Sequence, residues 1–498
     1  MQATNARSGE DTKDARLRDA AARPLRVAVT GATGFVGRHL VQALVQQGHE
    51  VIALSRSPRE DARSDVVWRQ ADLFSQQSTT QALAGVDVAV YLVHSMMPST
   101  SLFQGEFHDT DLLLADNFAR ACARNAVGRI VYLGGLAPDG HRSAHLESRL
   151  EVEGVLRASG IALTALRAGM IVGPGGSSFE ILHTLVRRLP WMILPAWTQR
   201  STQAVYLDDV VRVLGAAIAD PAFAGQTVDV VNGEPLTYEL LLRQMSEVLG
   251  LRRWMLPVPV SSTGFSKRWV ALFGDSSQEL VSPLVDSLLC DLPSHPPGSL
   301  VAPHVQVRSF REMARLSVAA ANEKQTPRPR RTERRGRTVR TVRSIQRLPP
   351  LPERDCGWVA DQYMNVLPEL FGPLQPIRVV RERDIVAFRV GGLARPLLEL
   401  RFVPSGDDGQ RTKFHIVGGL LSATRDTGWL EFRQVQDRRY TLAAIHEFVP
   451  SLPWAVYRAT QAPLHAWVML RFGAHLSHES PSAGADGASP RLSASGRP

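Results

Sequence analysis

The sequence of 498 residues has little cysteine and no long apolar run. Its three cysteines, Cys122, Cys290 and Cys356, are far apart and form no Cys-x-x-Cys pair. This usage excludes a disulfide framework and a cysteine metal site, and it is typical of a reducing compartment. The chain also lacks a window of about 18 uncharged apolar residues. Residues 1–23 lack the apolar core of a signal peptide. These absences predict a cytoplasmic protein with no transmembrane segment.

The net charge of +9 is concentrated in one segment. Residues 324–347 hold ten basic residues and one acidic residue, Glu333, so the remainder of the chain is close to neutral. The surrounding stretch, 322–350, is rich in arginine and proline and has no apolar periodicity, which predicts a basic disordered linker. Such a linker could contact an anionic surface or nucleic acid, but it contains no interleaved aromatic residues and no recognisable reading motif. A solvated tether is the favoured interpretation.

The most informative stretch is residues 30–37, which read TGATGFVG. It follows the apolar run 25–29 and opens a segment of helical spacing that ends at Gly48, so the order is strand, glycine turn and helix. The first glycine permits the tight turn, the second lets the backbone approach a pyrophosphate, and the third lets helix and strand pack closely. The phosphates would then lie at a helix N-terminus, which favours anions. An ordinary flexible loop is the weaker alternative. The predicted cofactor contacts in this stretch are Gly31, Thr33, Gly34, Phe35, Val36 and Gly37.

Further candidate ligand residues follow the next strands of the predicted sheet. The second strand ends at Arg56, about 20 residues after the glycines, where an acid would bind the ribose of NAD and an arginine suits the 2′-phosphate of NADP. Arg56 therefore favours NADP over NAD, unless it is an ordinary surface arginine. Asp72 ends the third strand-like run. The apolar run 86–93 brings Leu92 and His94 to the same carboxyl edge, where open α/β sheets bind ligands.

Strands and helices alternate through residues 25–321, which predicts a Rossmann-like, doubly wound parallel sheet with a small substrate lobe. Residues 1–24 are expected to form a disordered head. The run 189–197 is apolar and broken by proline, which suits either the lining of a substrate pocket or core packing. The helices expected after the fourth strand are 109–125 and 146–157, and the strands are 129–133 and 162–166.

The glycine spacing resembles that of the extended and atypical short-chain dehydrogenases/reductases. Two further segments resemble motifs of these families, LRAGMIVGPG at 166–175 and VYLDDV at 205–210. The segments YLVHSM at 91–96 and SAHLESR at 143–149 resemble the YbjT-like, NmrA-type branch of the atypical members. The resemblance covers roughly residues 25–320. It implies an NAD(P)-binding domain related to oxidoreductases.

The chain departs from the catalytic pattern of the families that it resembles. That pattern is Tyr-x-x-x-Lys, in which the lysine lowers the pKa of the tyrosine and holds the nicotinamide ribose, whereas His145 and Arg149 stand here. The helper serine after the fifth strand is also missing. In one interpretation His145 is a general acid/base and Arg149 anchors the cofactor, although an arginine cannot itself deprotonate. In the other, both are relics that line a pocket or pair with Glu147 and Glu153. His141 and His145 are four residues apart but lack a third ligand, so no metal site is predicted.

The pattern changes after the linker. Residues 351–476 contain successive strand-like runs closed by a helical segment, which predicts a smaller α+β domain of the helix-grip type with an apolar cavity under that helix. The segments LPW at 452–454 and APLH at 462–465 resemble the domain of unknown function that follows the nucleotide-binding domain in longer YbjT-like proteins. Residues 477–498 are rich in serine, glycine and alanine and are expected to be a disordered tail.

Two functional hypotheses follow. The first is an oxidoreductase-like protein that binds NADP, or NAD, and transfers hydride to or from a small apolar carbonyl or quinone-like substrate. The second is a non-catalytic NADP(H)-binding sensor, regulatory or assembly protein, as NmrA-type regulators and the nucleotide-binding accessory subunit of respiratory complex I are thought to be. The missing tyrosine, lysine and serine favour the second hypothesis. The glycine turn, and a histidine in place of the tyrosine, favour the first. The oligomeric state is left open.

Overall fold

The computed structural model describes most of the chain, in two compact units. The described residues are 24–59, 65–94, 102–138, 140, 142–234, 236–259, 290–292, 295–323, 341–372, 376–404, 409–424 and 427–479. The first unit consists of Met1–Ser99 and Glu106–Thr338, and the second of Thr100–Gly105 and Val339–Pro498. The predicted disordered head, the predicted tail from residue 480 and the middle of the predicted linker lie outside the described residues.

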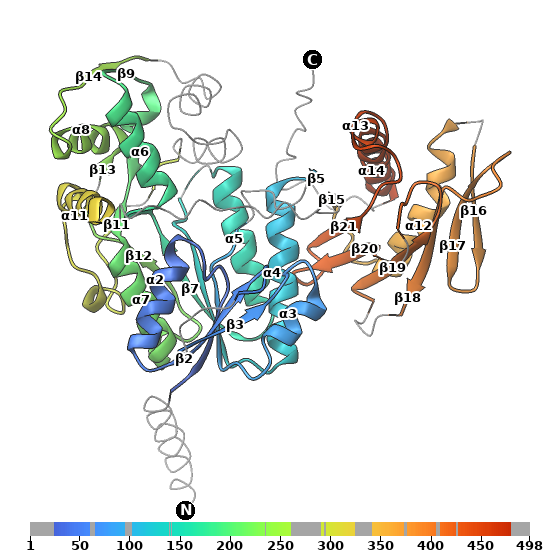
Figure 1. The fold of residues 1–498 in the computed structure, drawn as a ribbon, viewed down its shortest axis with the longest axis horizontal. Helices are drawn as coiled ribbons and strands as arrows, with labels where there is room; N and C mark the ends of the chain where they lie inside the picture. Colours follow the sequence, from blue (N-terminus) through green and yellow to red (C-terminus); the bar gives the residue numbers. More distant parts are fainter. Residues whose placement is uncertain are drawn as a thin grey trace, which may run out of the picture. The chain divides into compact units, whose positions relative to one another are not determined.

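The first unit is built on a seven-stranded sheet in the order β12-β7-β6-β4-β1-β2-β3, and every neighbouring pair is parallel (Figure 1). Its central strands are buried on both faces, which is why they read as near-continuous apolar runs. The predicted doubly wound, Rossmann-like sheet is therefore confirmed. The strands are β1 (Arg26–Val29), β2 (Glu50–Ser55), β3 (Val66–Gln70), β4 (Val88–Tyr91), β6 (Arg129–Gly135), β7 (Ala162–Ala168) and β12 (Thr227–Val230).

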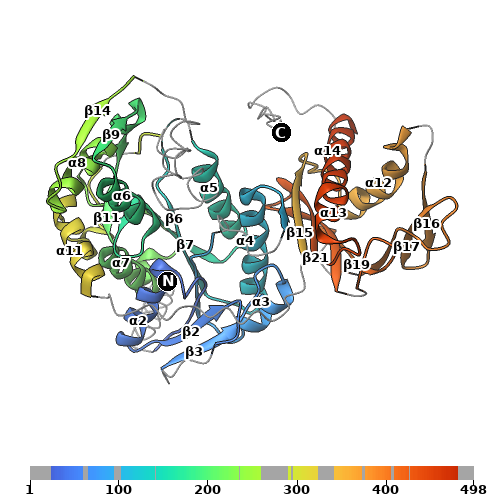
Figure 2. The same ribbon diagram turned by 45° about the horizontal axis from the view of Figure 1, so that its top comes forward.

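Helices cover both faces of this sheet (Figures 1 and 2). Helices α2 and α7 pack together on one face, and α3, α4 and α5 lie together on the other. In α2 the buried residues are Gly37, Leu40, Val41 and Leu44, a spacing that places them on one side of a helix. The helices are α2 (Phe35–Gln46), α3 (Gln76–Ala82), α4 (Phe107–Arg124), α5 (Ala144–Arg157) and α7 (Leu207–Ala219).

A small lobe with its own apolar core completes the first unit. It contains three pairs of short strands, β8 with β11, β9 with β14 and β10 with β13. Its elements are β8 (Met170–Val172), α6 (Ser177–Arg188), β9 (Trp191–Leu194), η1 (Ala196–Gln199), β10 (Ser201–Thr202), β11 (Ala204–Tyr206), β13 (Leu236–Thr237), α8 (Tyr238–Val248), β14 (Trp254–Pro257) and α11 (Phe310–Glu323). The short helices η2 (Pro221–Phe223) and η3 (Ala302–His304) pack instead on α7, beside the core of the parallel sheet.

The second unit is an α+β structure, as predicted. Its eight-stranded sheet has the order β16-β17-β18-β19-β20-β21-β15-β5 and is antiparallel except for the β15–β5 pair. Its helices α12 and α14 contribute to one apolar core with the sheet. Among the helices of the described part, none is long and apolar enough to cross a membrane. The elements are β5 (Leu102–Gln104), β15 (Val342–Leu348), α12 (Cys356–Glu369), β16 (Ile377–Glu382), β17 (Ile385–Val390), β18 (Leu398–Val403), β19 (Arg411–Gly418), β20 (Gly428–Val435), β21 (Tyr440–Phe448), α13 (Trp454–Ala459) and α14 (Gln461–Glu479).

The predicted linker 322–350 is not a linker throughout, because β15 lies inside it. Residues Val342–Leu348 pair with β21, and the first three of them also pair with the edge strand β5 of the second sheet. The arginines of this strand hide its apolar positions in the sequence, and each arginine has a partner from elsewhere in the unit. Arg343 forms an ion pair with Glu447, and the Arg347 guanidinium lies 4.6 Å from the centre of the Tyr440 ring.

Candidate functional site

The turn between β1 and α2 requires glycine at two of its three glycine positions, Gly31 because of its backbone conformation and Gly37 because of the space available. Gly31 has a φ of 64°, a left-handed conformation that L residues rarely adopt. A Cβ on Gly37 would lie 2.1 Å from the carbonyl oxygen of Gly31, which is an impossible contact. Gly34 closes the turn, since its N–H donates to the carbonyl of Gly31 at 2.8 Å. The local chain path therefore depends on the glycine spacing that the sequence displays.

The N-terminus of α2 is open to an anion. Its N-cap residue is Gly34, which has no side chain to accept from the first helical N–H groups, and the first turn contains no acidic residue. Thr33 and Gly34 are exposed, whereas Phe35 and Val36 are half-buried. Free N–H groups and the helix dipole at such a terminus favour phosphate. The turn thus fits a dinucleotide pyrophosphate, with backbone close enough to contact it.

A second glycine-rich loop packs on the first turn of α2. A Cβ on Gly176 would lie 2.8 Å from the Phe35 ring, and the Arg38 guanidinium donates to the carbonyl of Pro174 at 3.0 Å. The Gly175 N–H donates to the Glu180 carboxylate at 2.9 Å, which fixes the loop to the start of α6. The segment 166–175 therefore lies beside the glycine turn. Arg38 was not predicted from the sequence, since an exposed helix arginine carries no local signal.

Arg56 and Asp72 follow neighbouring strands, β2 and β3, at the carboxyl edge of the sheet. Arg56 is exposed, and its carbonyl accepts a hydrogen bond from the Gln70 side chain at 3.2 Å. Asp72 is half-buried and shapes its own turn, because its carboxylate accepts from the Phe74 N–H at 3.2 Å. The buried Asn117 side chain holds the same turn by donating to the Phe74 carbonyl at 3.1 Å. The guanidinium of Arg56 therefore remains accessible for a phosphate.

Leu92 and His94 leave β4 beside the glycine turn. The Thr30 hydroxyl donates to the Val90 carbonyl and accepts from the Leu92 N–H, both at 3.0 Å. A Cβ on Gly31 would lie 3.2 Å from the Leu92 carbonyl oxygen, so these two segments are in close contact. His94 is exposed at the end of this segment. The structure thus brings Leu92 beside the glycine turn.

His145 lies in the first turn of α5, which Ser143 caps by accepting from the Leu146 N–H at 3.2 Å. The side chain is partly buried, its ring centre is 6.4 Å from that of Phe107, and its Nδ1 atom has no hydrogen-bond partner among the described residues. Burial and the nearby charge of Arg149 lower the pKa of His145 to about 3. The imidazole is therefore neutral at physiological pH.

Arg149 is buried and is held from two sides. Its guanidinium lies 3.9 Å from the carboxylate of Asp111 on α4, and that carboxylate also accepts from the Ser148 hydroxyl at 3.2 Å. The Tyr132 hydroxyl donates to the Arg149 carbonyl at 3.1 Å. Burial opposes the charge of Arg149, but Tyr132 and Asp111 outweigh it and raise its pKa. Asp111 was not predicted as a site residue, although an acid beside apolar residues on a predicted helix was a usable signal.

The structure gives Glu153 other partners than Arg149. The Glu153 carboxylate accepts from Arg167 at 2.9 and 3.0 Å and from Arg157 at 3.1 Å. The pairing of Arg149 with Glu153, one of the alternatives drawn from the sequence, is therefore wrong, because Asp111 supplies the counter-charge. Among the described residues no group of three His, Cys, Asp or Glu could hold a metal ion, and His141 lies outside them.

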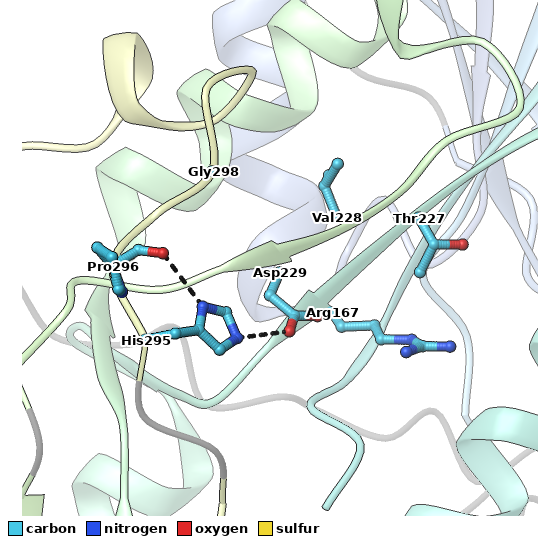
Figure 3. Close-up of a pocket in the computed structure, with 7 residues that line it drawn as sticks. All are labelled: Arg167, Thr227, Val228, Asp229, His295, Pro296 and Gly298. Carbon is cyan, nitrogen blue, oxygen red and sulfur yellow. Dashed lines mark hydrogen bonds and ion pairs between the residues drawn. The ribbon is translucent and has the colours of Figure 1, made fainter.

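A separate polar pocket lies at the β12 edge of the sheet (Figure 3). It has a volume of about 320 Å³ and is lined by parts of β7, β12 and the segment 295–298. The His295 ring contacts the Asp229 carboxylate at 2.9 Å and the Pro296 carbonyl at 3.1 Å. The Arg167 guanidinium points away from this pair (Figure 3). The Asp229–His295 contact thus anchors the segment 295–298, and no local pattern predicts a contact between residues 66 positions apart.

The parallel sheet, the glycine turn and the open helix terminus define the first unit as a dinucleotide-binding domain of the Rossmann type. Residues 31–185 match the family model described as NAD(P)H-binding. This part of the chain is therefore an NAD(P)-binding domain, as the resemblance to atypical short-chain dehydrogenases/reductases predicted.

Several proteins are similar in sequence to part of this chain. The auxiliary protein GraX of Staphylococcus aureus is 31% identical over 112 residues, which are 22% of this chain and 36% of GraX. The 2-alkyl-3-oxoalkanoate reductase of Stenotrophomonas maltophilia is 26% identical over 46% of this chain and 77% of that protein. The ceramide reductase of Caulobacter vibrioides is 27% identical over 47% of this chain and 73% of that protein. The match thus spans about a third of the length of GraX and more of the two reductases.

Two solved structures resemble this chain at low sequence identity. A nucleoside-diphosphate-sugar epimerase from Staphylococcus aureus is 19% identical, covers 58% of this chain and 100% of its own, and has a TM-score of 0.48. The triphenylmethane reductase of Citrobacter sp. is 19% identical, covers 59% of this chain and 99% of its own, and has the same TM-score.

Proposed function

We propose that this protein is an NAD(P)H-dependent oxidoreductase that transfers hydride to or from a small apolar carbonyl or quinone-like substrate, with NADP as the preferred cofactor. The observation that carries the proposal is the glycine turn at the open N-terminus of α2, where Gly37 leaves no room for a side chain and Gly34 leaves the first N–H groups free. The backbone of residues 31–36 would hold the pyrophosphate. The exposed Arg56 would neutralise a 2′-phosphate.

The cofactor supplies the hydride, and the chain supplies binding, orientation and a hydrogen bond. A neutral imidazole has one N–H donor and one acceptor nitrogen. With a pKa of about 3, His145 would donate its N–H to a carbonyl oxygen and would polarise it without first being protonated. A neutral histidine can serve as an electrophile in this way. His94 and Leu92 lie at the end of β4, where the substrate end of the site is expected.

The similar proteins support a reduction of apolar carbonyl compounds. Two of them are named for the reduction of a 2-alkyl-3-oxoalkanoate and of a ceramide. Both matches cover more than two thirds of those proteins.

A second candidate function is non-catalytic binding of NADP(H) by a sensor, regulatory or assembly protein. The specific observation in its favour is the position of Arg149, whose guanidinium is buried against Asp111 with only 7% of its side chain exposed. Because the Arg149 guanidinium lies against the Asp111 carboxylate, it is poorly placed to bind the nicotinamide ribose in the way that the lysine of the Tyr-x-x-x-Lys pattern does. Neither His145 nor Arg149 then needs to reach a substrate.

Binding and turnover are measured separately. NADPH and NADH are titrated into the purified full-length protein by fluorescence, and oxidation of the bound NADPH is followed by stopped flow with long-chain ketones, aldehydes and quinones. The proposal expects tighter binding of NADPH than NADH, and oxidation that slows at least tenfold in His145→Ala. The matched control is His478→Ala, an exposed histidine of the second unit. NADPH binding without oxidation by any acceptor would favour the sensor, and absence of binding would contradict both functions.

A further inference from the structure

Strands β9 and β14 of the lobe present an apolar surface to solvent. They pair in parallel with Trp191 opposite Trp254 and Ile193 opposite Leu256. The exposed fractions of these four residues are 69%, 67%, 40% and 64% in that order. The two indoles stack on each other with ring centres 5.2 Å apart and an angle of 14° between their planes. We call these four residues the tryptophan ribbon.

The exposure of the ribbon follows from strand alternation. On β9 the intervening residues, Met192 and Leu194, are buried in the lobe core, so Trp191 and Ile193 must face the other way. The sequence suggested either pocket lining or core packing for the run 189–197, but on β9 only alternate residues are buried. Exposing the apolar outer face of such a strand to water is unfavourable. Large exposed apolar patches of this kind mark interaction surfaces.

The backbone holds the ribbon in a fixed position. The Trp254 N–H donates to the Pro190 carbonyl at 2.9 Å, and the Val258 N–H donates to the Leu194 carbonyl at 2.9 Å. The Arg253 guanidinium donates to the carbonyl of Arg187 at 2.9 Å, and so ties the start of β14 to the end of α6. The two strands therefore present their side chains as one unit.

Arginines flank the ribbon at the start of both strands. Arg187 and Arg188 end α6, two residues before β9, and Arg252 and Arg253 precede β14. Arg187, Arg188 and Arg252 are exposed. Neither the stretch 187–194 nor the stretch 251–258 contains an acidic residue. The surface therefore combines stacked indoles and aliphatic side chains with positive charge at one end.

We infer that the tryptophan ribbon is a membrane-docking surface that inserts into the interfacial layer of an anionic lipid bilayer, with Arg187 and Arg252 against the phosphates. Tryptophan rings favour the interface between headgroups and acyl chains, and basic residues beside them are attracted to anionic lipids. A second copy of the chain fits less well. A two-fold interface would place each patch against itself, and the arginines of one copy would meet no acidic residue in these stretches of the other. The inference holds whether or not the protein reduces a carbonyl.

The experiment is co-sedimentation of the full-length protein with vesicles of phosphatidylcholine, with and without phosphatidylglycerol. We expect binding to the anionic vesicles that weakens steeply with salt, and quenching of tryptophan fluorescence by brominated lipid. The double variant Trp191→Ser/Trp254→Ser should bind the anionic vesicles at least about tenfold more weakly, since binding scales with inserted apolar area. The double variant Arg187→Gln/Arg252→Gln should lose about fivefold per arginine on anionic vesicles only.

The matched control is Phe402→Ser/Leu464→Ser, which removes two exposed apolar residues from the second unit. It should bind vesicles as the unchanged protein does. Circular dichroism checks that all variants fold, and Leu256→Glu supplies a variant that keeps both indoles and should also lose binding. The inference is overturned if the unchanged protein does not bind either vesicle, or if the double tryptophan variant binds equally well. It is also overturned if binding depends only on residues 324–338, or if the tryptophan variants abolish a dimer and not lipid binding.

Discussion

The substitution Gly37→Ala tests the glycine turn most directly. The added Cβ would lie 2.1 Å from the carbonyl oxygen of Gly31, 2.8 Å from its carbonyl carbon and 2.9 Å from the Cα of Ala32. All three are backbone atoms, so no flexible side chain can yield. To restore an ordinary contact of 3.4 Å from 2.1 Å, α2 must move away from the turn by about 1.3 Å. Such overpacking costs typically about 1–3 kcal/mol, and it displaces the N–H groups that would face the pyrophosphate.

Two assays follow this change. Thermal unfolding should show a lower midpoint for Gly37→Ala, and fluorescence titration should show NADPH binding weakened by about tenfold or more, since 1.4 kcal/mol corresponds to a factor of ten. Gly391→Ala is the control, because that glycine has open space around it and no left-handed φ. Unchanged stability together with an unchanged Kd for NADPH in Gly37→Ala would refute the assignment of the turn as a tightly fitted phosphate site.

Three further predictions concern buried ionisable side chains, and in each the free energy of unfolding is measured with urea. Asp111→Asn leaves the Arg149 guanidinium buried without its carboxylate and should destabilise the protein by about 3 kcal/mol, whereas Asp361→Asn, in an exposed ion pair, should cost under about 1 kcal/mol. The pKa of His145 is about 3 in the folded protein and about 6.5 in the unfolded chain. The unfolded chain therefore binds more protons, and the free energy of unfolding falls as the pH drops from 6.5 towards 3. The variant His145→Gln should remove that loss, which reaches up to about 4 kcal/mol. Burial raises the pKa of Glu431, but Arg433 and Arg411 outweigh this effect and hold that pKa well below its usual value. Glu431→Gln should cost about 3 kcal/mol at pH 7 and less below pH 4, and equal costs at both pH values would contradict the charge effect.

Local patterns were sufficient to predict the parallel sheet and the glycine turn. The central strands of the parallel sheet are apolar on both faces, and the helix after the turn repeats its apolar residues with a helical period. Each of these elements therefore has a signal within its own sequence. The spacing of Gly31, Gly34 and Gly37 is itself the steric requirement of the turn. The sequence therefore locates the glycine turn from short-range information alone.

The remaining features depend on contacts between distant residues. Strand β5 has three residues and pairs with Val342–Ser344, about 240 positions later, and no local signal predicts such a pairing. Strand β15 was hidden by arginines whose partners lie on β21. The counter-charge of Arg149 comes from another helix, and the exposure of Trp191 depends on which face of β9 meets the lobe core. Burial and pairing of this kind are decided by tertiary packing.

The replacement of tyrosine and lysine by His145 and Arg149 changes the effect that the cation has on the pKa of the neighbouring ring. A phenol changes from neutral to anionic near pH 10, so an adjacent cation lowers its pKa towards neutrality and makes it a better proton carrier. An imidazole changes from cationic to neutral near pH 6.5, so the same cation lowers its pKa away from neutrality. Burial acts in the same direction on His145, and the two effects bring its pKa to about 3. The tyrosine–lysine and His145–Arg149 pairs have the same spacing in the sequence. The cation nevertheless moves the pKa of a tyrosine towards neutrality and that of a histidine away from it.

This difference predicts the pH dependence of any turnover. If His145 polarises the carbonyl as a neutral donor, the rate of NADPH oxidation should show no titration near pH 6.5, because the imidazole is neutral throughout the range from about pH 5 to 8. The proton that completes the alcohol would then come from water. Stopped-flow rates at saturating NADPH across that range test the expectation, with His145→Gln as the variant that retains an N–H donor and should keep more activity than His145→Ala. A rate that halves near pH 6.5 in the unchanged protein and loses this dependence in His145→Gln would show instead that the imidazole gains and loses a proton during turnover.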